Sequence, residues 1–167
     1  MTRIERLSFT GADERALDPR RLHGDVSIVA DASDTPAMPV PGHWLGFPVT
    51  PALVTWRLVS SSGALLHKRV AADFRFQEPP QLDFWKVYAE GTYQNFPDFA
   101  YHLYWHLPGR YLFNLTASPL NTRRLRNGIY KITVLAADAC GNKSTLSEQI
   151  TVDNSRTAHP ATRQRRA

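Results

Sequence analysis

The feature that most restricts the fold of this chain is an alternation of apolar and polar residues with a period of two. It is clearest in residues 128–137, GIYKITVLAA, where every second residue from Tyr130 to Ala136 is apolar. Lys131 and Thr133, which lie between them, are polar. Successive side chains of a β-strand point to opposite faces, so this segment predicts a strand with one buried face.

Similar short alternating segments recur along the chain, separated by turn residues. They include residues 24–34, the hairpin of residues 52–74 around Ser61-Ser62-Gly63, a shorter strand that ends at Gly91, and residues 110–117 and 144–154. Pro (12) and Gly (9) are frequent, and no segment predicts a helix of about ten residues or more. The prediction is an all-β, antiparallel, two-sheet immunoglobulin-like sandwich of about seven strands, with a closed barrel as the alternative. Residues 33–51 are predicted to form a long Pro-rich loop, and residues 93–108 an aromatic-rich loop.

The length and the charge distribution suggest one domain with two polar ends. We expect a polar leader over residues 1–21, the sandwich over residues 22–154 and a basic disordered tail over residues 155–167. The net charge of +5 comes largely from four arginines in that tail, because 16 basic residues face 15 acidic ones in the rest of the chain. A basic end without a compact basic face does not predict specific nucleic-acid binding.

Cysteine content and hydropathy bear on localisation. Cys140 is the only cysteine, so no disulfide forms within the chain. No segment approaches the roughly 18 apolar residues that predict a membrane span, and residues 1–18 lack the apolar core of a signal peptide. We therefore expect no membrane insertion, a cytoplasmic location if the chain is complete, and an extracellular or cell-surface location if it is a fragment of a larger protein.

The end of the domain resembles the last two strands of bacterial immunoglobulin-like domains. In those domains a Gly-x-Tyr start, an alternating strand, an Asp-x-x-Gly-Asn turn and a final strand ending in Val-Asp-Asn follow one another. The matching residues here are Gly128, Tyr130, Asp138, Gly141, Asn142, Val152, Asp153 and Asn154. The resemblance implies structural roles for these residues: Tyr130 as a buried tyrosine corner and Gly141 with positive φ in the turn. The chain departs from the pattern in lacking paired core cysteines and in having Arg126 where an Asp often precedes the tyrosine.

The resemblance implies a non-catalytic binding or spacer module of a bacterial surface or secreted protein, without a cofactor. Its partner would be a protein or a glycan. Two alternatives are an accessory or remnant domain of a secreted hydrolase such as a peptidase, and a carbohydrate-binding sandwich. No paired carboxylates, Gly-rich phosphate loop or Ser-His-Asp arrangement is evident in the sequence.

Three groups of residues are candidates for metal binding or reactivity. Asp138, Asn142 and Asp31, with Asp34, are candidate calcium ligands, although a turn in which Asp138 accepts backbone hydrogen bonds explains the same residues. Cys140 is expected to be an unreactive thiol in that turn, since no histidine is near it in sequence. His102 and His106 have the spacing of a helical zinc pair but lack the accompanying glutamate.

Aromatic residues of the two long loops are the candidates for ligand or partner contact. If they are exposed together, they would stack on sugar rings or pack against a partner's apolar surface. The alternative is that they cover the open end of the sandwich as a satellite core. The four candidates are Trp44, Trp85, Tyr101 and Trp105.

Overall fold

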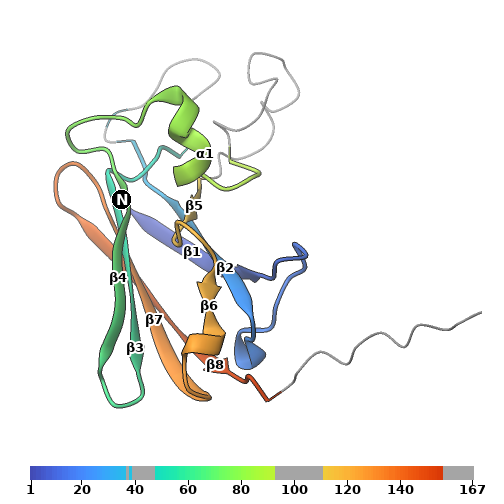
Figure 1. The fold of residues 1–167 in the computed structure, drawn as a ribbon. Coiled ribbons are helices and arrows are strands. Elements are labelled where there is room, and N and C mark those ends of the chain that lie inside the picture. Colours follow the sequence, from blue (N-terminus) through green and yellow to red (C-terminus); the bar gives the residue numbers. More distant parts are fainter. Residues whose placement is uncertain (37, 39–47, 93–110, 156–167) are drawn as a thin grey trace, which may run out of the picture.

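Two antiparallel β-sheets pack face to face in the computed structural model, which describes residues 1–36, 38, 48–92 and 111–155 (Figure 1). The first sheet has the order β1-β2-β5, with β6 also paired to β2; the strands are β1 (Arg3–Thr10), β2 (Asp25–Ser33), β5 (Leu112–Asn114) and β6 (Leu120–Asn121). The second sheet has the order β4-β3-β7-β8, formed by β3 (Leu53–Ser60), β4 (Leu65–Asp73), β7 (Gly128–Ala137) and β8 (Lys143–Val152). The predicted all-β, two-sheet immunoglobulin-like sandwich is confirmed.

The core lies between the sheets and follows the alternation seen in the sequence. Val26, Ile28 and Ala30 of β2 are buried, and Ile132 and Val134 of β7 are fully buried opposite them. The same arrangement holds in β3, in which every second residue from Val54 to Leu58 is buried. Burial of one face of each sheet removes apolar side chains from water, which is the main stabilising contribution to a sandwich of this kind.

The predicted hairpin around Ser61-Ser62-Gly63 is present as β3 and β4. Gly63 has φ +84°, and its N–H donates to the Ser60 carbonyl at 2.9 Å. A positive φ is costly for residues with a Cβ, so glycine at this position favours the tight reversal.

Tyr130 forms the hydrogen bond expected of a tyrosine corner. Its ring is buried, and its hydroxyl donates to the Arg126 carbonyl oxygen at 2.6 Å. Four residues separate donor and acceptor, so the bond fixes the chain as it enters β7.

The two lateral edges of the sandwich differ. At the edge formed by β1 and β8, Leu22 donates to the Thr151 carbonyl and accepts from the Asp153 N–H, at 2.8 and 2.9 Å. This bridge joins the segment after the 3-10 turn η1 (Pro19–Arg21) to the second sheet and closes that edge. At the opposite edge, β4 faces β5 and β6, and the Arg69 guanidinium crosses to the Leu115 carbonyl at 3.0 Å. Among the described residues, this second edge is linked by the Arg69 side chain and has no backbone bridge between the sheets.

The predicted polar leader over residues 1–21 is wrong. Arg3–Thr10 is strand β1, which pairs with β2 and buries Leu7 and Phe9 in the core. A β-bulge between Ile4 and Arg6 shifts the register. A bulge adds a residue to one strand and breaks the period of two, which is why the alternation is hard to recognise in the sequence.

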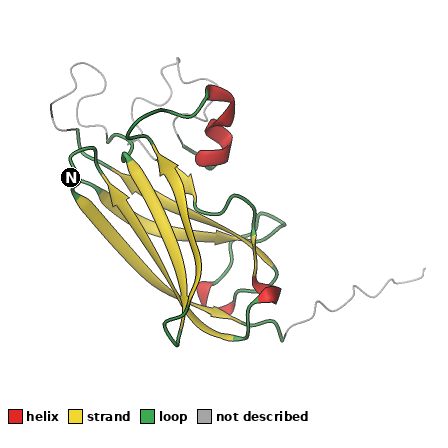
Figure 2. Cartoon of the chain, turned by 60° about the vertical axis from the view of Figure 1, so that its left-hand side comes forward, coloured by secondary structure: helices red, strands yellow, loops and turns green. Residues whose placement is uncertain are grey.

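The predicted strand ending at Gly91 is also wrong. Residues 81–87 form the 3-10 turn η3 (Gln81–Asp83) and the short helix α1 (Phe84–Val87), which lies across one end of the sandwich (Figure 2). Phe84, Val87 and Tyr88 pack against the core at positions i, i+3 and i+4, which is the spacing of a helical face. Tyr88 then forms an isolated bridge with Phe113 of β5.

The connection between β5 and β7 is more ordered than its polar sequence suggests. It contains β6 and the 3-10 turn η6 (Thr122–Arg124), and both Leu120 and Thr122 are buried. None of the helices in the described part of the chain has the length and apolar character to cross a membrane.

Candidate functional site

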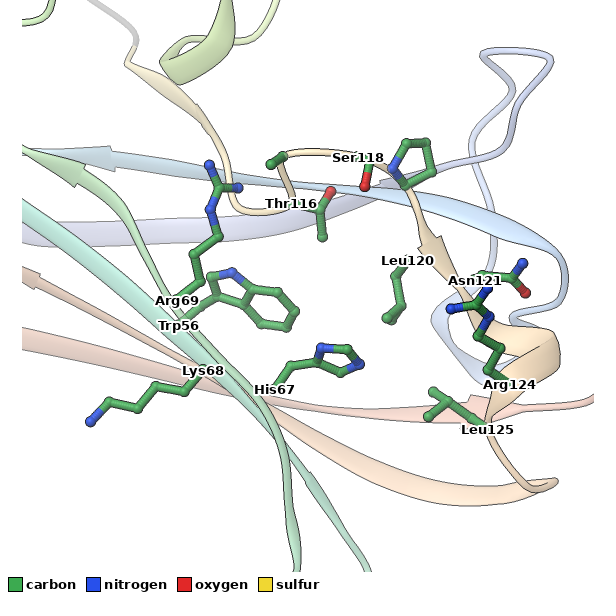
Figure 3. A pocket seen from close by; sticks show the side chains of 12 residues that line it. Trp56, His67, Lys68, Arg69, Thr116, Ser118, Leu120, Asn121, Arg124 and Leu125 are labelled. Atoms are coloured by element: carbon green, nitrogen blue, oxygen red, sulfur yellow. The ribbon is translucent and has the colours of Figure 1, made fainter.

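A cavity of about 430 Å³ lies at the side-chain-linked edge of the sandwich, between β4 and the segment 116–125 (Figure 3). Its walls come from three regions that are far apart in the sequence: β3, β4 and the connection that follows β5. The volume falls in the range of small-molecule sites, roughly 300–1,000 Å³. We refer to it as the edge cavity.

Strand alternation places the first wall. Trp56 of β3 pairs with Arg69 of β4, and Leu58 pairs with His67. Because Trp56 and Leu58 face the core, His67 and Arg69 lie on the same inner face of the hairpin. The Trp56 and His67 rings are nearly parallel, with centroids 6.2 Å apart and an interplanar angle of 15°. Lys68 lies on the other face, and its side chain points away from the cavity in Figure 3.

The opposite wall is held by hydrogen bonds at the turn η6. The Asn121 side chain caps the turn by accepting from the Arg123 N–H at 3.0 Å, and the Thr122 hydroxyl donates to the Gly24 carbonyl at 2.9 Å. The Asn154 side-chain amide donates to the carbonyls of Thr122 and Leu125, at 2.9 and 3.1 Å. These bonds hold Arg124 and Leu125 in place at the cavity.

The Asn154 interaction explains in physical terms the Val-Asp-Asn sequence that ends β8. Its side chain reaches from the end of the last strand to η6, and its backbone N–H is bound by the Asn127 side chain at 2.9 Å. Asn154, the last residue of the Val-Asp-Asn sequence, therefore stabilises one wall of the edge cavity.

The charge around the edge cavity is of one sign. Its lining contains the cationic residues Arg69 and Arg124, together with Lys68, whose side chain points away from the cavity, and no Asp or Glu is among the described residues that line it. Neither Arg69 nor Arg124 forms an ion pair within residues 1–36, 48–92 and 111–155. The floor is apolar, with Trp56, Leu120 and Leu125. The site therefore combines an apolar floor with guanidinium groups and the hydroxyls of Thr116 and Ser118.

The Trp56 indole nitrogen is a buried donor without an acceptor among the described residues. The whole residue is 4% exposed, and Figure 3 shows the nitrogen on the ring edge that faces Arg69 and Thr116. A buried polar group that lacks a partner is uncommon and costs about 1–3 kcal/mol. Its dipole adds to the positive potential of the guanidinium groups.

The calcium candidates do not form a metal cluster in the part of the chain that is described. No group of three or more His, Cys, Asp or Glu side chains that would hold an ion is present there. Both carboxylate oxygens of Asp138 accept from Asn142, from its N–H at 2.8 Å and from its side-chain amide at 2.7 Å. Asp31 lies 3.8 Å from the Arg6 guanidinium, and Asp34 lies 3.0 Å from the amino terminus.

The Asp138–Asn142 turn has the geometry of a structural Asx turn. The side-chain hydrogen bond from Asn142 is the main cause of a lowered Asp138 pKa, and backbone N–H groups of the turn contribute to the same shift. Gly141 has φ +87°, in the region that favours glycine. Cys140 is an exposed free thiol in this turn.

Aromatic side chains gather at the end of the sandwich that carries α1. Tyr88 contacts Phe113 at a ring-centroid distance of 5.2 Å, and the rings of Phe74, Phe84 and Tyr111 lie around it. Burial raises the pKa of Tyr88 to about 12, although the hydrogen bond with Thr50 acts in the opposite direction. These residues extend the core at this end.

The residues predicted to contact a ligand are only partly placed. Trp85 of α1 is 61% exposed, and its carbonyl accepts from the Asn114 side chain. Trp44, Tyr101 and Trp105, together with His102 and His106, lie outside the described residues. None of the predicted candidates that are described lines the edge cavity.

The sequence analysis missed the edge cavity because its residues have ordinary structural explanations. Trp56 matches a core position of a strand, and His67 and Arg69 match the polar side of a hairpin. One signal was present: residues 118–128 contain three arginines within four positions and no acidic residue. Comparisons of the chain with models of protein families, with curated proteins and with solved structures found no match. The strand order therefore establishes the fold alone, two antiparallel sheets in a sandwich-like arrangement with a cavity at one lateral edge.

Proposed function

We propose that this chain is a non-catalytic, immunoglobulin-like binding module and that the edge cavity is its ligand site. The observation that carries the proposal is a preformed concave site in which an apolar floor is combined with unpaired polar groups. Small-molecule sites are typically concave, mostly apolar and equipped with a few fixed polar groups. The hydrogen bonds at η6 and the Arg69–Leu115 contact provide this preorganisation.

A binding role fits the polar groups better than catalysis does. His67 makes no hydrogen bond to Thr116 or Ser118 within the described residues, and its ring lies against Trp56. A nucleophilic hydroxyl requires a base within hydrogen-bond reach. The same module would serve beside a hydrolase domain, and the reading frames next to its gene would distinguish an accessory role from an independent one.

A ligand-observed NMR screen with a fragment library tests the proposal. Fragments that bind the wild type should lose binding in Ala117→Trp, because this exposed residue lines the cavity and a large ring there would occupy it. Ser62→Trp, at the exposed β3–β4 turn and outside the cavity, is the matched control. If every fragment that binds the wild type also binds Ala117→Trp, the edge cavity is not a ligand site.

A further inference from the structure

We infer that the edge cavity takes a small organic anion, whose carboxylate or related oxyanion is attracted by the guanidinium groups of Arg69 and Arg124 and whose apolar part lies on the floor. This inference rests on the proposed function, because it names the ligand class for that site. Figure 3 shows Arg69 on one side of the cavity and Arg124 on the other, with Leu120 between the ring of Trp56 and Arg124.

The guanidinium groups of Arg69 and Arg124 carry positive charge into the lining of the edge cavity. Each guanidinium is permanently charged, and neither has an acidic partner within the described residues. Elsewhere in the described chain, Arg3, Arg6, Arg15 and Arg75 each lie within 4 Å of a carboxylate, whereas Arg20, Arg21, Arg57, Arg123 and Arg126 form no ion pair there. What distinguishes Arg69 and Arg124 from these is their position, because both line a concave, partly apolar site whose low-dielectric walls strengthen the field.

The hydrogen-bonding groups of the cavity wall also favour an anionic ligand. Arg69 uses one N–H for the Leu115 carbonyl, which leaves four further donors on its planar group. The unpartnered Trp56 N–H is also a donor, and the hydroxyls of Thr116 and Ser118 are able to donate. A site rich in donors and free of carboxylates favours an acceptor-only group, and an oxyanion is such a group.

The apolar floor selects the remainder of the ligand. Trp56 and Leu120 are buried, while Leu125 is half-buried, so these residues offer carbon surface to the cavity. An inorganic ion would leave that surface in contact with water. An organic acid with a ring or short chain would cover it and so remove apolar surface from water.

Benzoate and benzamide provide the test, because they have nearly the same shape and differ in charge. The probe is the indole N–H proton resonance of Trp56, assigned by its loss in Trp56→Phe and followed by NMR at constant ionic strength. Benzoate should shift this resonance in a saturable manner. Benzamide should bind at least about tenfold more weakly, the usual effect of losing a charge-assisted hydrogen bond.

Arg124→Gln and Arg123→Gln form a matched pair of variants. Both residues are exposed and lie on η6, and both variants remove one positive charge, but only Arg124 lines the cavity. Arg124→Gln should weaken benzoate binding about tenfold or more, while Arg123→Gln should change it by less than about threefold, as a distant screened charge does. Arg69→Gln serves as a second variant if its spectrum shows that it folds.

Three outcomes would overturn the inference. Equal binding of benzamide and benzoate would remove the anion preference but leave the edge cavity as a ligand site. Equal losses in Arg123→Gln and Arg124→Gln would mean that net charge, not the cavity, attracts the anion. No shift of the Trp56 resonance by benzoate at millimolar concentration would exclude this ligand class, and the fragment screen would then decide separately whether the cavity binds any ligand.

Discussion

Replacing Asn154 tests how strongly the end of β8 supports the wall of the edge cavity. The half-buried side-chain amide donates two hydrogen bonds, to the carbonyls of Thr122 and Leu125 at 2.9 and 3.1 Å, and its oxygen accepts a longer one from the Thr122 hydroxyl at 3.4 Å. Each donated bond is worth about 1 kcal/mol net. The Thr122 carbonyl keeps its bond from the Leu125 N–H, while the carbonyl of the half-buried Leu125 loses the one donor that the described residues give it. Asn154→Ala should therefore lower the free energy of unfolding by about 2 kcal/mol and the melting temperature by about 4–8 °C.

Asn154→Asp should lower the free energy of unfolding more than Asn154→Ala does at neutral pH. The change replaces the donating nitrogen by a negatively charged oxygen that faces two carbonyl oxygens. This environment would raise the pKa of the introduced carboxyl above its unfolded value of about 3.9. The folded state would then bind more protons than the unfolded state, so the deficit should shrink as the pH falls towards about 4.

Urea unfolding followed by tryptophan fluorescence measures both effects. With a slope of about 2 kcal/mol per M, Asn154→Ala should move the midpoint by about 1 M without changing the slope. Asn114→Ala is the control, since its amide makes one exposed bond, to the Trp85 carbonyl at 3.2 Å, and it should cost less than about 1 kcal/mol. If Asn154→Asp is as stable as Asn154→Ala at pH 7, the Asn154 nitrogen does not donate to the carbonyls of Thr122 and Leu125, and the proposed support of the cavity wall is refuted.

Four further predictions concern the core and the turn between β7 and β8. Val134→Ala should cost about 1–3 kcal/mol, because Val134 is fully buried and the lost methyl groups leave a cavity; a neutral result in chemical denaturation would contradict its core position. Gly141→Val should lower the melting temperature, since φ is +87° there, whereas Gly141→Asn should be tolerated better; equal melting curves would refute the strain argument. The lowered Asp138 pKa means that its contribution to stability is present above about pH 4 and is lost as the pH falls through the folded-state pKa, so Asp138→Asn should weaken the acid dependence of unfolding below that pH. Millimolar calcium should leave the melting temperature of the wild type unchanged, and a rise that Asp138→Asn abolishes would identify a calcium site instead.

Local residue pattern accounts for the strands in which one face is buried without interruption. In β2 and β7 every inward position is apolar, so the period of two is visible in the sequence. The turns at Gly63 and Gly141 were predictable for a similar reason, because the residue type and the required backbone angle are directly related. The tyrosine corner also depends on residues only four apart, Arg126 and Tyr130.

Local pattern was misleading where tertiary contacts changed the period. The bulge in β1 concealed its alternation, and the polar residues of Arg3–Thr10 concealed its place beside β2. The apolar residues of Phe84–Val87 occur at a spacing that suits either a short strand or a helical turn. Packing of Phe84, Val87 and Tyr88 on the end of the core favours the helical turn. The core surface against which they pack is formed by other segments, so the residues of this segment alone do not predict it.

The edge cavity depends entirely on the packing of the two sheets. Trp56, Arg69 and Arg124 come from β3, β4 and η6, and each has an ordinary explanation in its own segment. They share a cavity because Leu22 bridges the sheets at one lateral edge, while the opposite edge is joined by the Arg69–Leu115 contact. The positive charge of the site follows from the fold, which brings Arg69 and Arg124 to one cavity whose described lining contains no carboxylate, and not from any short run of sequence.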